Sequence, residues 1–181
     1  MPAIVEAYAD YSPPIDVRRL VEDMVASVPA ENLVGLGQIV LTNSAALTGS
    51  RKRKWTRRLG RKVKHADAAG LYHQAWKGQT AWIELFVDRI VEGTPLLLLR
   101  IPIVRAVVFG RVLFHEVGHH IHKVMRPEHR EPEHVADDWA RRLGRIHIRR
   151  RHAVARALLL PVRWTSRVLR RITVPERGAR R

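Results

Sequence analysis

The stretch of residues 101–124 constrains the fold more than any other part of the chain, because its apolar residues recur at the spacing of one broad helical face. Two histidines, His115 and His119, lie within this stretch, four residues apart. Residues four apart lie one turn apart on the same side of a helix. The sequence therefore predicts a buried helix with two neighbouring imidazoles, and its apolar face comprises Val104, Val107, Val108, Phe114, Val117, Ile121 and Val124.

Residues 115–119 read His-Glu-Val-Gly-His, which is the H-E-x-x-H pattern typical of zinc hydrolases. Zinc binds neutral imidazole nitrogens, so His115 and His119 are predicted Zn²⁺ ligands. Glu116 lies on the adjoining flank of the helix, where its carboxylate could take a proton from a metal-bound water. The alternative is a surface helix that is rich in histidine and binds no metal.

A catalytic zinc site uses three protein ligands and a water. The chain has no cysteine, so the third ligand must be a histidine or a carboxylate. Glu133 and Asp137 share one face of the next predicted helix, since they are four residues apart. This spacing favours Glu133 as the ligand and Asp137 as a hydrogen-bond acceptor for a ligand histidine. Two histidines remain as alternatives for the third ligand, His129 and His134.

The segment His115-Glu-Val-Gly-His, followed by Glu133-x-x-Ala-Asp-x-Trp-Ala, resembles the gluzincin zinc metallopeptidases. More narrowly it resembles the small minigluzincins and the ImmA/IrrE-type regulatory metallopeptidases, over roughly residues 81–144. The resemblance implies Glu133 as the third ligand and a mixed sheet whose edge strand receives an extended substrate. Such enzymes often use a Tyr or His to stabilise the oxyanion, and the candidates here are Tyr72, His73 and His147.

These residues predict a zinc-dependent metallopeptidase, in which Glu116 activates a zinc-bound water to hydrolyse a bond in a peptide or protein substrate. The rival hypothesis comes from a different class of protein. It is a non-catalytic nucleic-acid-binding or regulatory protein with a structural or degenerate metallopeptidase domain. That rival predicts salt-sensitive binding of DNA or RNA that survives the substitution Glu116→Gln.

The formal net charge of +16 is concentrated in two basic segments. Residues 51–64 carry nine Lys and Arg and no acid, and residues 141–181 carry fourteen Arg and one acid, Glu176. Such blocks are typical of a nucleic-acid partner, an acidic protein or an anionic membrane surface. We therefore expect such a partner to bind through residues 51–64 and 145–181. The alternative is that both segments are simply solvated.

In the N-terminal half, residues 1–11 are expected to form a loose arm, and Ser12 is expected to cap a helix that ends at Pro29. Residues 34–41 predict a first strand. The basic residues 51–64 predict either a short amphipathic helix or an insert loop.

Further along the chain, residues 70–76 and 81–90 predict two strands, and the second of these alternates apolar and polar residues most clearly. The other expected features are a hairpin turn at Lys77-Gly-Gln, a helix break at Pro102, and a Glu-bearing helix from Pro132 to Gly144.

Together these elements predict an α+β fold, in which a small antiparallel or mixed sheet packs on the H-E-x-x-H helix and on the following Glu-bearing helix. The predicted division is a metallopeptidase-like domain of residues 1–144 and a basic helical tail of residues 145–181.

The location expected from the sequence is cytoplasmic. The first 20 residues hold no apolar run of the kind found in a signal peptide, and the absence of cysteine fits a reducing compartment. The most apolar stretch, residues 96–108, is interrupted by Arg100, Pro102 and Arg105. A membrane-spanning helix needs about 20 apolar residues, so this stretch is too short and too charged.

Overall fold

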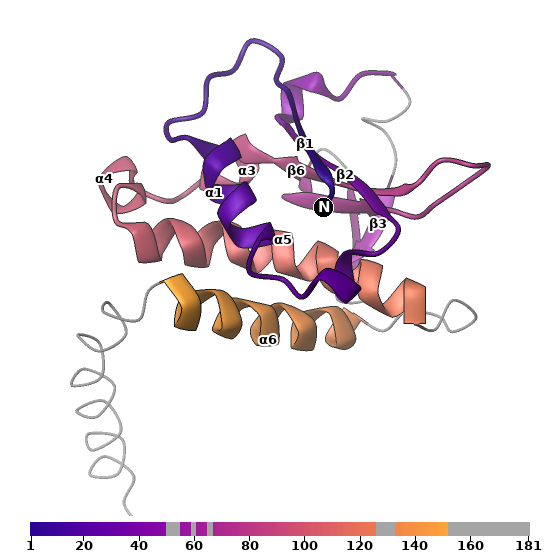
Figure 1. The fold of residues 1–181 in the computed structure, drawn as a ribbon. Coiled ribbons are helices and arrows are strands. Elements are labelled where there is room, and N and C mark those ends of the chain that lie inside the picture. The colour runs from indigo at the N-terminus through magenta and orange to yellow at the C-terminus, as the bar shows by residue number, and fades with distance from the viewer. Residues whose placement is uncertain (50–54, 59–60, 65–66, 126–132, 152–181) are drawn as a thin grey trace, which may run out of the picture.

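The computed structural model describes residues 1–49, 55–58, 61–64, 67–125 and 133–151. At its centre is a four-stranded sheet, which in spatial order comprises β1 (Ala3–Ala7), β2 (Leu36–Thr42), β6 (Ala81–Phe86) and β5 (Gly70–His73) (Figure 1). The first three strands are parallel, and β5 runs antiparallel to β6. The predicted α+β class is therefore confirmed, with a mixed sheet.

The other elements surround this sheet. In chain order they are α1 (Val17–Val25), the 3-10 helices η1 (Ala30–Leu33) and η2 (Ser44–Ala46), β3 (Trp55–Arg58), β4 (Arg61–Lys64), α3 (Val87–Val91), α4 (Leu96–Leu99), α5 (Pro102–Met125) and α6 (Glu133–Arg151). The long helix α5 lies between the sheet and α6 in Figure 1. Within the part of the chain that the structure describes, no helix is both long enough and apolar enough to span a bilayer.

One hydrophobic core joins the sheet to α5. The paired residues Ile39 and Ile83, on β2 and β6, are fully buried and belong to the same cluster as Phe109 and Leu113 of α5. Because α5 is covered by the sheet on one side and by α6 on the other, its apolar face is wide. Pro102 is the first residue of α5, where its missing N–H costs no hydrogen bond, so the predicted break at this proline is confirmed.

The expectation of a loose N-terminal arm is wrong, because residues 3–7 form β1 at the edge of the sheet. Side-chain hydrogen bonds hold the C-terminal end of β1, in addition to the backbone hydrogen bonds of the strand pairing. The Thr42 hydroxyl donates to the Ala7 carbonyl at 2.7 Å, and the Ala9 amide donates to Asn43 Oδ1 at 2.8 Å. The strand predicted at residues 34–41 is therefore the second strand, β2, and not the first.

The predicted cap at Ser12 is also wrong. Helix α1 begins later, and Asp16 caps it by accepting a hydrogen bond from the amide of Arg19 at 2.9 Å.

Of the two hypotheses for residues 51–64, the helix is wrong. β3 and β4 form an antiparallel pair in this segment, in which Trp55 lies opposite Lys64 and Arg58 lies opposite Arg61.

The strand predicted at residues 70–76 ends early, at His73, but the hairpin turn after it is confirmed. Trp76 and Gln79 exchange two backbone hydrogen bonds, and Lys77 and Gly78 both have positive φ angles, of 46° and 83°. The strand predicted at residues 81–90 stops at Phe86, after which the chain turns into α3.

Helix α6 does not end at Gly144 as predicted but continues to Arg151, so it crosses the expected boundary between domain and tail. The extension is held by contacts with α1 and with the turn that follows it. The buried ring of His147 places Nδ1 3.1 Å from Ser27 Oγ, and Arg151 forms an ion pair with Asp23 at 2.9 Å. These tertiary contacts offset the roughly 1 kcal/mol that glycine costs within a helix. Residues 152–181 of the predicted tail lie outside the described residues.

The first prediction concerns the contact between α5 and α6. A Cβ added at Gly118 would lie 2.8 Å from the Ala136 carbonyl oxygen and 2.9 Å from its Cα. Gly118→Ala should therefore lower the free energy of unfolding by roughly 1–3 kcal/mol, because backbone must move to relieve the overlap.

The matched control is Gly144→Ala in α6, where the added Cβ would lie 3.8 Å from the Phe114 ring, an ordinary contact. Since alanine favours a helix by about 1 kcal/mol, this variant should be as stable as the wild type or slightly more so. Urea unfolding of both variants measures the difference. Equal free energies for the two would contradict the close contact at Gly118.

Candidate metal centre

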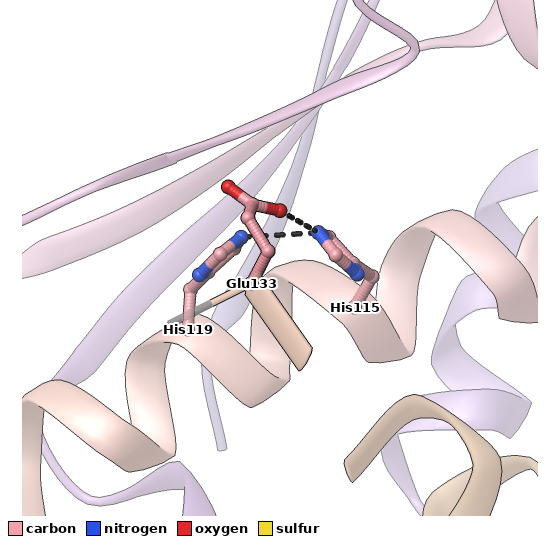
Figure 2. A group of neighbouring side chains, drawn as sticks. All are labelled: His115, His119 and Glu133. Atoms are coloured by element: carbon pink, nitrogen blue, oxygen red, sulfur yellow. Dashed lines mark hydrogen bonds and ion pairs between the residues drawn. The ribbon is translucent and has the colours of Figure 1, made fainter. Parts of the chain in front are cut away.

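Helix α5 brings two histidine rings together, as the spacing of the sequence predicts. The Nε2 atoms of His115 and His119 lie 3.1 Å apart, and the two rings meet edge to face with centroids 4.6 Å apart. Figure 2 shows both rings pointing from one side of the helix toward the same space. His115 is buried, which holds its ring in this orientation.

A third side chain, from α6, lies beside these two histidine rings. Glu133 is the first residue of this helix, and its Oε2 lies 3.5 Å from His115 Nε2 (Figure 2). One ligand atom from each of His115, His119 and Glu133 falls within 4.8 Å of the other two. The structure therefore assembles a group that could hold a metal ion, from two helices separated in sequence by residues 126–132.

The glutamate supports this interpretation with a buried oxygen. Glu133 Oε2 is shielded from solvent and makes no hydrogen bond within the described part of the chain, although it lies 3.5 Å from His115 Nε2. A buried carboxylate oxygen without a hydrogen bond is costly. A cation between the three side chains would supply the missing partner.

Asp137, one turn after Glu133, lies against the far side of the His115 ring. Its Oδ1 is 2.9 Å from His115 Nδ1, so this nitrogen carries the proton and donates, which leaves the Nε2 lone pair directed at His119 and Glu133. Burial lowers the pKa of His115 and the neighbouring His119 lowers it further, although Asp137 and Glu133 act in the opposite direction. The neutral ring is the form that binds metals.

Glu116 is buried and lies against the edge strand of the sheet. A Cβ added at Gly70 of β5 would lie 3.0 Å from Glu116 Oε1 and 2.6 Å from a methyl of Val112. The missing side chain of Gly70 thus makes room for the carboxylate. Sequence analysis missed this residue, because Gly70 is the first residue of the predicted strand, where a glycine gives no clear signal of close approach.

His120, the neighbour of His119 on α5, contacts other parts of the fold and does not belong to the metal-binding group. His120 Nε2 donates to the Val34 carbonyl at 2.9 Å, which leaves Nδ1 to accept the Tyr72 hydroxyl at 3.3 Å. Burial also lowers the pKa of His120. His134, an alternative for the third ligand, is exposed on α6 and does not belong to the metal-binding group, and His129 lies outside the described residues.

Of the three candidates for oxyanion stabilisation, Tyr72 contacts α5 through His120 and His147 contacts it through Phe114. His73 is the next residue on β5 and so points to the opposite face of the sheet, where it stacks on Trp82 at 3.8 Å. His147 is buried against α1, near the far end of α6.

No protein-family model, curated protein or solved structure matches this chain. The candidate metal centre is therefore supported by the geometry of His115, His119 and Glu133.

The second prediction tests the support that Asp137 gives to this centre. Asp137→Ala should weaken zinc binding by roughly 10–100-fold, because it removes the acceptor that orients the His115 ring. Glu133→Ala should weaken binding further, since it removes a ligand. Competition with a chromophoric chelator measures both affinities.

Asp138→Ala is the matched control, because Asp138 is the next residue on α6 but is exposed and paired with Arg141. It should bind zinc as the wild type does. Equal affinities for the Asp137 and Asp138 variants would show that the hydrogen bond does not support the centre. If Glu133→Ala keeps zinc while His134→Ala or His129→Ala loses it, a three-histidine site must replace the one described.

Proposed function

We propose that this protein is a zinc-dependent peptidase of the gluzincin type. The observation that carries the proposal is the convergence of His115, His119 and Glu133, with Glu116 in the adjoining position on α5. Two neutral imidazoles and one carboxylate form a ligand set that suits Zn²⁺ and leaves one coordination position open. When bound, zinc would polarise a carbonyl and make water acidic enough to act near neutral pH.

In this proposal each side chain of the centre has a separate task. His115, His119 and Glu133 would hold the ion, and Asp137 would fix the tautomer of His115. Glu116 is the general base, which takes a proton from the attacking water and passes it to the leaving amine. A carboxylate suits both steps because it can accept a proton and then donate it.

The edge strand β5 offers a place for the substrate. β5 is one of the two outer strands of the four-stranded sheet in the described part of the chain, and it is the one that contacts α5 beside Glu116. An extended peptide can add to such an edge through backbone hydrogen bonds. Because Glu116 lies against Gly70 of β5, a peptide paired with this strand would pass close to the proposed base.

The third prediction tests the base. Glu116→Gln should leave the fold and the zinc affinity unchanged but lower the rate of peptide hydrolysis by roughly 10²–10⁴-fold, because an amide cannot accept the proton. Cleavage of a peptide library, followed by mass spectrometry, detects activity without knowledge of the natural substrate.

Glu31→Gln is the matched control, since Glu31 is exposed on η1 and should tolerate the change. A Glu116→Gln protein that cleaves the library at the wild-type rate would rule out this mechanism. Zinc binding without cleavage by the wild-type protein would favour a structural metal centre.

A further inference from the structure

A cluster of exposed aliphatic side chains lies at α4 and the start of α5. Leu96, Leu97, Leu98 and Ile101 have 65%, 72%, 43% and 44% of their surface exposed, and we call these four residues the apolar tip. Single exposed leucines are common on proteins, but four exposed aliphatic residues within six positions are an unusual local concentration of apolar surface.

The local structure holds the tip outward. Leu99 is fully buried and anchors α4, so the three preceding leucines of this one-turn helix cannot also turn inward. Pro95 precedes α4 and Pro102 opens α5, and both restrict the backbone on either side. The exposed surface is therefore a fixed feature of the fold.

The surroundings of the tip are basic. Arg100 is exposed between Leu99 and Ile101, and Arg105 follows one turn into α5. Glu92 is the only acid in the sequence between residues 89 and 105, and it is paired with Arg89 at 3.0 Å. The tip thus combines aliphatic side chains with uncompensated positive charge.

The antiparallel arrangement of α5 and α6 adds further charge at the same end of the molecule. Figure 1 shows α4 and the C-terminal end of α6 on the same side. That end of α6 carries three consecutive exposed arginines, residues 149–151, of which Arg151 is paired with Asp23. The chain continues from there with residues 152–181, whose sequence holds eight Arg and one acid, Glu176.

We propose that the apolar tip docks on an anionic lipid membrane, with its leucines in the boundary between headgroups and acyl chains and the arginines on the lipid phosphates. Surface-bound proteins use this combination of aliphatic insertion and basic flanks. Nucleic acid fits the tip less well. Proteins that bind nucleic acid stack aromatic rings on the bases and place cationic side chains on the phosphates, and neither contact uses leucine. The docking does not depend on the proposed peptidase activity.

If the protein is also a peptidase, docking would set the distance of its metal centre from the lipid surface. His115 follows Ile101 by about 14 residues of helix, which is about 20 Å at the rise of an α-helix. The centre would then stand above the lipid surface and act on polypeptide segments that extend from the membrane. This last step rests on the proposed function.

The fourth prediction uses the full-length protein and two kinds of vesicle, one of phosphatidylglycerol mixed with phosphatidylcholine and one of phosphatidylcholine alone. Flotation should show binding to the anionic vesicles and little to the neutral ones, and added salt should weaken the binding. Leu97→Asp should reduce the affinity roughly tenfold or more, because it replaces an inserted leucine with a negative charge.

Met125→Asp is the matched control, since Met125 is 63% exposed at the opposite end of α5 and should not affect vesicle binding. Vesicle binding that is absent, or unchanged in Leu97→Asp, would overturn the proposal. A marked fall in the melting temperature of Leu97→Asp, or the loss of a dimer, would also overturn it, because the protein itself would then cover the tip. A loss of nucleic-acid binding in Leu97→Asp would overturn the proposal as well.

Discussion

The close contact of α5 with α6 at Gly118 and Ala136 is the constraint on which the rest of the structure depends. At this point the two helices meet backbone to backbone, without room for one additional carbon atom. The contact lies between the residues that each helix contributes to the metal centre. A larger residue at either position would separate the helices and move Glu133 away from His115 and His119.

The far end of α6 is fixed by a different kind of contact. There His147 and Arg150 reach Ser27 in the turn after α1, and both contacts are polar. The close contact sets the distance between α6 and α5, while these polar contacts set the direction in which α6 runs. These two sets of contacts, both within the described residues, therefore position Glu133 and Asp137.

Sequence analysis predicted the parts of the fold that have a regular period or a characteristic turn. The four-residue spacing of His115 and His119 and the hairpin turn at residues 77–79 belong to this class. β1 was missed because a short edge strand with exposed residues lacks a clear pattern, and its pairing with β2 is a long-range contact. The end of α6 was misplaced at Gly144 because contacts with α1 outweigh local helix propensity. The role of Gly70 required the three-dimensional approach of α5 to β5.

The position of Glu133 at the start of α6 has a consequence for the energetics of the whole chain. An ion held by His119 and Glu133 would close the intervening segment into a loop, as a disulfide does, in a chain that has no cysteine. In the chain-entropy model, closing a loop of about 15 residues stabilises a fold by about 3 kcal/mol. The metal centre would then be a removable cross-link. The protein would alternate between a cross-linked form and a less stable form without the cross-link as the concentration of metal around it changes.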